Sequence, residues 1–178
     1  MLEWNAYGDY PQIDKTAYIH PSAVVIGKVV IGSGVFIAPG AVIRADEEES
    51  SIMIADRCNI QDHVVIHALG HSRVELGERT SLSHGCIVHG PCKIGKDCFI
   101  GFNSVIFNAE LEDHVFVKFM AGALDVHIPA GRVIPSGTVI DTAAKADALL
   151  VMPKELEIFS RNVLQANAVL LKGYRKET

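Results

Sequence analysis

The sequence of 178 residues predicts an all-β protein, a parallel β-helix built from six-residue repeats with a C-terminal α-helix packed alongside it. Three observations support this prediction. Aliphatic residues recur every six positions, small or β-branched residues follow them four positions later, and helical periodicity replaces the rhythm after residue 140. A period of six matches neither an α-helix nor a simple amphipathic strand, but it fits short straight sides joined by turns. We expect one domain, with the β-helix over residues 1–141 and a helical segment over residues 142–178.

The aliphatic positions define the register of the β-helix. They are Ile13, Ile19, Val25, Ile31, Ile37, Ile43, Ile54, Ile60, Ile66, Leu76, Leu82, Val88, Ile94, Ile100, Ile106, Leu111, Val117, Ala123, Ile128, Ile134 and Ile140. Insertions at residues 45–51 and 68–73 interrupt the rhythm. Glycines such as Gly77 and Gly131 are expected to supply turn conformations that other residues resist. Three sides per coil give a coil of about 18 residues, so positions three turns apart should stack on the same side.

The four cysteines fall at one place in the repeat. Cys58, Cys86, Cys92 and Cys98 each follow a register residue by four positions, where other turns carry Ala, Val, Thr or Ser. A zinc site or disulfides are the alternatives, but the spacing of six residues is not that of a zinc ribbon. We therefore expect free, inward-pointing cysteines that act as small hydrophobic side chains.

Two helices are expected after the β-helix. Residues 141–150 predict a short helix, Pro153 opens a longer one, and Gly173 ends it. The longer helix carries an apolar stripe of Leu156, Phe159, Val163, Leu164 and Leu170. We expect this stripe to cover one side of the β-helix, and coenzyme or partner binding remains an alternative role for it.

Composition and charge exclude several classes of function. A formal net charge of -5 and a pI near 5.9 argue against nucleic acid as a partner. No apolar run reaches the length of a membrane span, and the first residues lack the pattern of a secretory signal. We expect a soluble cytoplasmic protein with no membrane partner.

Two columns of polar side chains emerge from the register. Arg44, His67 and His89 each directly follow a register residue of turns three apart, so they should stack about 4.8 Å from their neighbours. Two imidazoles at that spacing can share one metal ion. Asp62 and His84 each stand two positions after a register residue, and they form a second column at the preceding corner.

A three-fold assembly would bring the two columns together at each interface between subunits. His67 and His89 of one subunit and His84 of the next would then bind one metal, and Arg44 would face Asp62. Three neutral imidazoles with an open position are typical of a catalytic metal site. The remaining histidines are interpreted as solvated surface residues: His20, His63, His71, His114 and His127.

Five segments carry a resemblance to a known family. They are IRADE (43–47), NIQDHVVIHAL (59–69), SLSHGCIVHGP (81–91), FIGFNSVIFNA (99–109) and IPAGRVIPSG (128–137). Together they resemble the γ-class carbonic anhydrases, over nearly the whole chain, and the three-histidine pattern is the specific part. The resemblance implies a left-handed β-helix of hexapeptide repeats and a homotrimer that hydrates CO2 reversibly to bicarbonate. The implied cofactor is Zn2+, or Fe2+ or Co2+, and such a site lowers the pKa of bound water to about 7, the value known for carbonic anhydrase itself.

The resemblance also implies roles for individual residues. It makes His67, His84 and His89 the metal ligands, and it makes Arg44, Asp46 and Asp62 the residues of the contact between subunits. Gln61, Glu47 and Asn167 are the implied catalytic residues. Gln61 would hydrogen-bond the bound water, and Glu47 would border the open metal position. Asn167 would position CO2 or bicarbonate. From the residues alone, Glu47 could equally be a solvated charge in an acidic loop.

Two positions depart from the family pattern. Gly70 stands where better-known members carry a glutamate that shuttles protons, and Gln165 stands where a tyrosine is expected. Proton transfer could pass through Glu47, His71 or buffer instead. Two rival functions therefore remain, a catalytically weak, metal-binding trimeric scaffold and a CoA-dependent hexapeptide acyltransferase with one histidine as the base.

Overall fold

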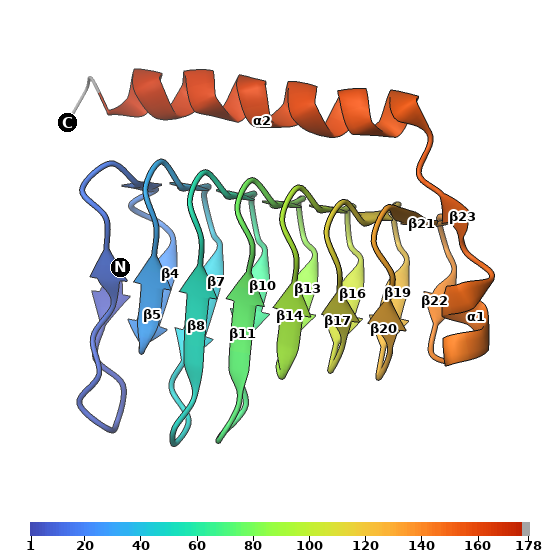
Figure 1. Ribbon diagram of the computed structural model, residues 1–178. Coiled ribbons are helices and arrows are strands. Elements are labelled where there is room, and N and C mark those ends of the chain that lie inside the picture. Colours follow the sequence, from blue (N-terminus) through green and yellow to red (C-terminus); the bar gives the residue numbers. More distant parts are fainter. Residues whose placement is uncertain (176–178) are drawn as a thin grey trace.

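The computed structural model describes residues 1–175, and it confirms an all-β parallel β-solenoid with a long helix along one side (Figure 1). The last three residues of the expected segment 142–178 lie outside the described residues. The chain winds around three sheets, here named A, B and C, which hold eight, seven and eight strands. All strand pairs are parallel except one at the C-terminal end.

The strands are short, as the six-residue repeat requires. Sheet A contains β1 (Leu2–Glu3), β4 (Val24–Gly27), β7 (Val42–Ala45), β10 (Val65–His67), β13 (Ile87–His89), β16 (Val105–Phe107), β19 (Gly122–Leu124) and β22 (Val139–Ile140). Sheet B contains β2 (Gln12–Ile13), β5 (Val29–Ile31), β8 (Ser51–Ile54), β11 (Arg73–Leu76), β14 (Cys92–Ile94), β17 (Glu110–Leu111) and β20 (His127–Ile128). Sheet C contains β3 (Tyr18–Ile19), β6 (Phe36–Ile37), β9 (Asn59–Ile60), β12 (Ser81–Leu82), β15 (Phe99–Ile100), β18 (Phe116–Val117), β21 (Arg132–Ile134) and β23 (Leu150–Val151).

The register positions fill the interior of the solenoid, as predicted. Ile43, Ile66 and Val88 are aligned on successive strands of sheet A and are fully buried. Full burial of such a side chain stabilises a fold by about 1.5–3 kcal/mol. Because side chains alternate along a strand, the residues on either side of each register position face outward. The packed interior therefore fixes which side chains reach the surface.

The role expected of the glycines is only partly correct. Gly131 has a positive φ of 65°, as expected of a turn residue. Gly77 does not, and a Cβ there would lie 2.5 Å from the carbonyl carbon of Gly95 in the next coil. Close approach of successive coils is thus the reason for glycine at position 77. Several corners instead place a larger residue at positive φ, among them Arg57 (58°) and His63 (57°).

The short helix after the solenoid is shorter than predicted. It is α1 (Ala143–Asp147), and the Thr142 side chain accepts a hydrogen bond from the backbone N–H of Lys145 at its N-terminus. Residues 150 and 151 form β23, which pairs antiparallel with β21. The prediction that the helix extends to residue 150 is therefore wrong, because residues 150 and 151 pair with β21 as a strand instead.

The long helix α2 (Lys154–Tyr174) runs along sheet C, in the place expected for it (Figure 1). It begins after Pro153 but continues one residue past Gly173, the predicted stop. Leu156 and Val163 pack against a cluster of Phe99, Phe116 and Val133 on sheet C. Leu170 is 47 % exposed, so its place in the predicted stripe is wrong. The buried helix residues are Ser160, Asn167 and Leu171. Within residues 1–175, no helix has the length and apolar character needed to cross a membrane.

Candidate metal centre

The first predicted column forms along the outer face of sheet A. Arg44 on β7, His67 on β10 and His89 on β13 are direct partners in the parallel register. The inward packing of the neighbouring register residues turns all three side chains outward. The structure thus confirms the stacking that the six-residue period predicted.

The two histidines of this column lie close enough to share a ligand. His67 Nδ1 lies 3.1 Å from His89 Nε2, and the ring centroids are 4.9 Å apart. His67 Nε2 lies 3.4 Å from Asp46 Oδ1 and 3.4 Å from Glu47 Oε1. His67 Nε2, His89 Nδ1 and Asp46 Oδ1 are buried without a hydrogen-bond partner among the described residues. The facing nitrogens, His67 Nδ1 and His89 Nε2, are spaced so that one metal ion with bonds of about 2.0–2.1 Å could bind both.

The charge state of His67 also fits metal binding. Its side chain is 11 % exposed, and burial lowers its pKa, with the nearby Arg44 and His89 acting in the same direction. The carboxylates of Asp46 and Glu47 oppose this shift but do not reverse it. A neutral imidazole is the form that donates a lone pair to a metal. The lowered pKa of His67 thus favours the neutral imidazole, the form that a metal ion would require.

The second predicted column lies at the corner between sheets C and A. His84 Nδ1 is 2.8 Å from Asp62 Oδ2, and the His84 ring stacks on Phe102 with centroids 5.4 Å apart. His84 thus sits apart from the histidine pair. Within residues 1–175, no group of three or more His, Cys, Asp or Glu side chains is placed to hold a metal. One chain presents two of the expected ligands in one column and the third in the other.

The residues expected at a contact between subunits have partners within the chain. Arg44 Nη1 lies 3.5 Å from Asp46 Oδ2, and Asp62 contacts His84. Arg44 and Asp62 belong to different columns, so they are not paired within one chain. Asp46 stands between the guanidinium of Arg44 and the ring of His67.

The two insertions in the repeat stack on one another beside the histidine pair. The backbone N–H of Gly70 donates to Glu47 Oε2 at 2.7 Å, while Glu47 Oε1 faces His67. His71 Nδ1 lies 3.1 Å from Glu49 Oε2. Glu47 is therefore anchored beside His67, with its side chain 46 % exposed. Gly70, at the position of the expected acidic shuttle, contributes a backbone donor only.

Gln61 and Asn167 meet in a cluster of amides between sheet C and α2. Gln61 Nε2 donates to Asn167 Oδ1 at 2.9 Å and to Asn59 Oδ1, and Asn167 Nδ2 donates to the carbonyl of Val163. Within the described residues no hydrogen bond reaches Gln61 Oε1. The cluster thus holds the Gln61 amide while leaving Oε1 available to accept a hydrogen bond from a group outside the cluster.

Sequence reasoning missed Asn59, which is 1 % exposed and holds Gln61. The signal was present in the repeat. At the same position of sheet C, other strands carry Tyr18, Phe36, Phe99 and Phe116, so Asn59 and its neighbour Ser81 interrupt an aromatic column.

The cysteines take the structural positions predicted for them. All four are free and buried. Burial raises the pKa of Cys58 and of Cys98 to about 12, and it also raises the pKa values of Cys86 and Cys92. Thiols in this state are poor nucleophiles and poor metal ligands.

Comparisons with known proteins agree with the fold. The pattern of the bacterial transferase hexapeptide family (six repeats) matches residues 10–45 and 73–108. A carbonic anhydrase of Methanosarcina thermophila is 36 % identical over 197 aligned positions, which cover 99 % of this chain and 79 % of that protein. The carboxysome assembly protein CcmM of a Nostoc species is 39 % identical over 173 positions, covering 92 % of this chain but 31 % of that protein.

A solved structure shares the fold across its whole length. It is a putative acetyltransferase of Bacillus cereus, with a TM-score of 0.86 at 22 % identity, covering 99 % of this chain and 98 % of that one. At this identity the likeness concerns the fold alone. The repeat pattern and the full-length identity to a carbonic anhydrase identify the family: this chain belongs to the γ-class carbonic anhydrases, within the hexapeptide-repeat proteins.

Proposed function

We propose that this protein is a homotrimeric, metal-dependent enzyme that converts CO2 reversibly to bicarbonate, with one site at each interface between subunits. The observation that carries the proposal is the in-register pair of His67 and His89, whose facing nitrogens, Nδ1 and Nε2, lie 3.1 Å apart. The same chain presents His84 at the other edge of sheet A. The carbonic anhydrase relative, matched over 99 % of this chain, supports the same reaction.

The outer face of sheet A supports association of subunits. Beside the histidine columns it exposes apolar side chains, namely Ile87, Val105, Phe107 and Val139, each between 36 % and 44 % exposed. Phe102 and Phe119 extend the second column, with ring centroids 4.7 Å apart. An apolar surface of this kind around polar residues marks an interaction site. In a closed three-fold ring, the first column of one subunit would face the second column of its neighbour.

The proposed reaction needs residues that hold the metal and a residue that orients water or bicarbonate. His67 and His89 of one subunit and His84 of the next would hold a divalent metal, for which zinc, ferrous iron and cobalt are all suitable. When bound, such an ion supplies a Lewis acid that makes hydroxide available from water near neutral pH. Gln61 Oε1, fixed by Asn59 and Asn167, accepts a hydrogen bond from the attacking water or from bicarbonate.

The release of a proton is assigned to the acidic loop. Glu47 Oε1 lies 3.4 Å from His67 Nε2, and Glu47 Oε2 is held by the Gly70 amide. This carboxylate can accept the proton that water loses when it replaces bicarbonate. His71, in the second insertion, lies against Glu49, which belongs to the same loop as Glu47. Its imidazole can pass the proton to solvent.

Mixed trimers test the shared site directly. Neither His84→Ala nor His89→Ala chains alone should bind metal or hydrate CO2. When the two variants are coexpressed, random assortment in a closed ring pairs an intact first column with an intact second column at about one quarter of the interfaces. We expect metal content and CO2 hydration to return to about that fraction of the parent values.

A matched mixture provides the control. Coexpressed His67→Ala and His89→Ala chains each lack a ligand of the first column, so no interface can be complete, and neither metal nor activity should return. Equal recovery in both mixtures, or none in the first, would contradict a site shared as proposed.

A catalytically weak scaffold is the second candidate, because one observation favours it. Gly70 offers no side chain at the place of the acidic shuttle, so proton transfer depends on Glu47 and His71. The carboxysome assembly relative supports such a role. Trimers that bind metal without hydrating CO2 would favour it.

A further inference from the structure

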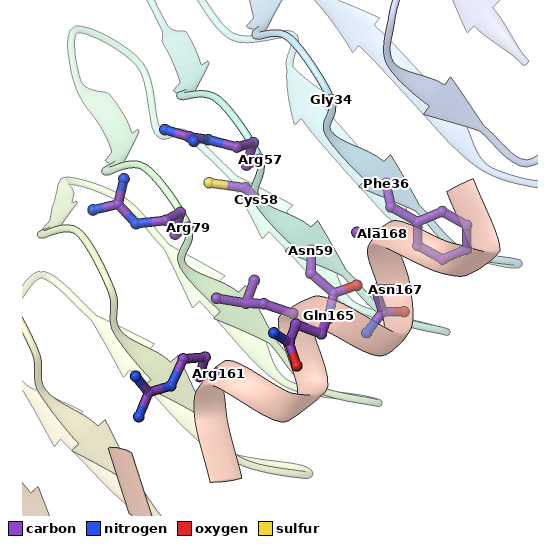
Figure 2. A pocket seen from close by; sticks show the side chains of 11 residues that line it. Gly34, Phe36, Arg57, Cys58, Asn59, Arg79, Arg161, Gln165, Asn167 and Ala168 are labelled. Atoms are coloured by element: carbon purple, nitrogen blue, oxygen red, sulfur yellow. The ribbon is translucent and has the colours of Figure 1, made fainter. Parts of the chain in front are cut away.

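A cavity of about 270 Å3 lies between α2 and the corner that joins sheet B to sheet C, and we refer to it as the α2 cavity (Figure 2). Its apolar wall consists of Phe36, Cys58, Leu164 and Ala168. Its size is just below that of the pockets that hold drug-like ligands. The cavity can therefore take a small organic molecule.

Three arginines line this cavity, and two carboxylates pair with them. Arg79 binds Asp97 through two hydrogen bonds of 2.7 Å each. Glu78 accepts one bond from Arg57 at 3.1 Å and one from Arg79 at 2.9 Å. Arg161, on α2, has no ion-pair or hydrogen-bond partner within residues 1–175. The cavity thus retains about one uncompensated positive charge.

One acidic residue of α2 lies near the free arginine. Glu157 precedes Arg161 by one helical turn and lines the neighbouring cavity with it, but the two side chains form no ion pair. Arg161 therefore remains available to a ligand in the α2 cavity, and Glu157 is the group that would compete with such a ligand for it.

Buried amides provide a second, independent sign of a missing ligand. Asn59 lines the cavity and is 1 % exposed, and its Nδ2 donor has no partner within the described residues. Leaving such a donor unpaired costs about 1–3 kcal/mol, so native structures rarely tolerate it. Asn167 also lines the cavity and is 7 % exposed. Figure 2 shows Asn59 on the strand side of the cavity, and Asn167 and Gln165 on α2.

We propose that the α2 cavity binds a small organic carboxylate. Its carboxylate would pair with Arg161, since a guanidinium group matches the two oxygens of this head group. Its apolar body would pack against Phe36 and Leu164, and its polar edge would accept a hydrogen bond from Asn59 Nδ2. One net positive charge suits a monoanion better than a phosphate monoester, which carries about −1.5 to −2 charges at neutral pH.

The α2 cavity is separate from the candidate metal centre. Arg57 and Arg79 lie at the corner between sheets B and C, whereas the histidine columns flank sheet A. The proposed contact between subunits therefore leaves the cavity open. Asn59 and Asn167 also hold Gln61, so, if the proposed function holds, an occupied cavity should change the rate of CO2 hydration.

Calorimetric titration of the full-length protein tests the binding site. We expect hexanoate to bind, and hexanamide and acetate to bind at least about tenfold more weakly, because each lacks either the charge or the apolar body. Arg161→Gln should weaken hexanoate binding by about tenfold or more, whereas Lys172→Ala on the same helix should leave it unchanged. Glu157→Gln should strengthen binding by removing the competing carboxylate.

Several results would overturn the proposal. They are absence of hexanoate binding at millimolar concentration, equal binding of hexanamide, no effect of Arg161→Gln, or binding of inorganic phosphate in preference to hexanoate. The same titration on the His89→Ala protein separates this inference from the proposed function. Hexanoate should bind there with unchanged affinity, although metal binding is lost.

Discussion

Replacing Arg44 with alanine should weaken the proposed trimer strongly. In the chain Arg44 lies 3.5 Å from Asp46, and in the assembly it would also face Asp62 of the next subunit. The proposed contact between subunits would bury this pair, and removing one partner of a buried ion pair costs about 3 kcal/mol or more, because Asp62 would keep only His84 as its partner. A trimer has three such interfaces, so the total loss is about 9 kcal/mol, or roughly six decades in the dissociation constant.

This loss has a measurable consequence for assembly. The trimer dissociation constant has units of concentration squared, so the concentration at which half the subunits dissociate should rise by about three decades. Sedimentation velocity over a dilution series measures this shift directly. Lys93→Ala is the matched control, because Lys93 pairs with Glu110 within the chain on sheet B and is largely exposed.

A double-mutant cycle then identifies the partner of Arg44. If Arg44 faces Asp62 across the interface, Asp62→Ala should weaken the trimer similarly, and the double variant should be little worse than either single variant. An Arg44→Ala protein that trimerises as tightly as the parent would refute the two-column arrangement. So would a cycle that couples Arg44 only to Asp46.

Three further predictions concern the same structure. His89→Ala should abolish metal binding, measured by elemental analysis, but leave the melting temperature of the metal-free protein nearly unchanged, because the side chain faces outward from the core. Burial raises the pKa of Asp97, but its hydrogen bonds from Arg79 outweigh burial and lower it below the usual value of 3.8. That pair therefore stabilises the folded state above pH 3.8 and loses this effect as the pH falls further. Arg79→Met should cost about 0.5–1 kcal/mol at pH 7 in urea unfolding, less near pH 3, and a pH-independent difference would contradict the assignment. Cys86→Val should change stability by less than about 1.5 kcal/mol and leave metal content unaltered, since valine occupies the same inward position in other coils; loss of metal would contradict a structural role.

The stacking of His67 on His89 could be predicted from the sequence because a solenoid converts a sequence period into a spatial one. The register residues are buried, so their immediate neighbours must face outward, and turns three apart must align. This reasoning also placed His84 beside Asp62, in a separate column. No propensity argument about single strands, each two to four residues long, would have achieved this.

The face of α2 could not be predicted in the same way. Apolar periodicity placed Leu170 inward, but the structure buries Leu171 together with Ser160 and Asn167. The reason lies on sheet C, where Leu171 meets Phe36 and Ala38. Asn167 instead meets the polar pair of Gln61 and Asn59. A pattern read along the helix alone does not contain the chemistry of the surface that it covers.

Two other features depended on contacts distant in sequence. Strand β23 forms only because Leu150 meets Val133 of β21, and the local sequence resembles a helix. The position of Glu47 results from the stacking of two irregular insertions, through the amide of Gly70. Neither insertion follows the repeat, so the repeat does not predict their conformation.

Stopped-flow CO2 hydration, with metal content determined on the same anaerobically purified sample, tests the central claim most directly. The shared metal site predicts that hydration activity rises in proportion to bound metal and disappears in the His89→Ala protein. A metal-replete parent protein that hydrates CO2 no faster than the His89→Ala protein would contradict it.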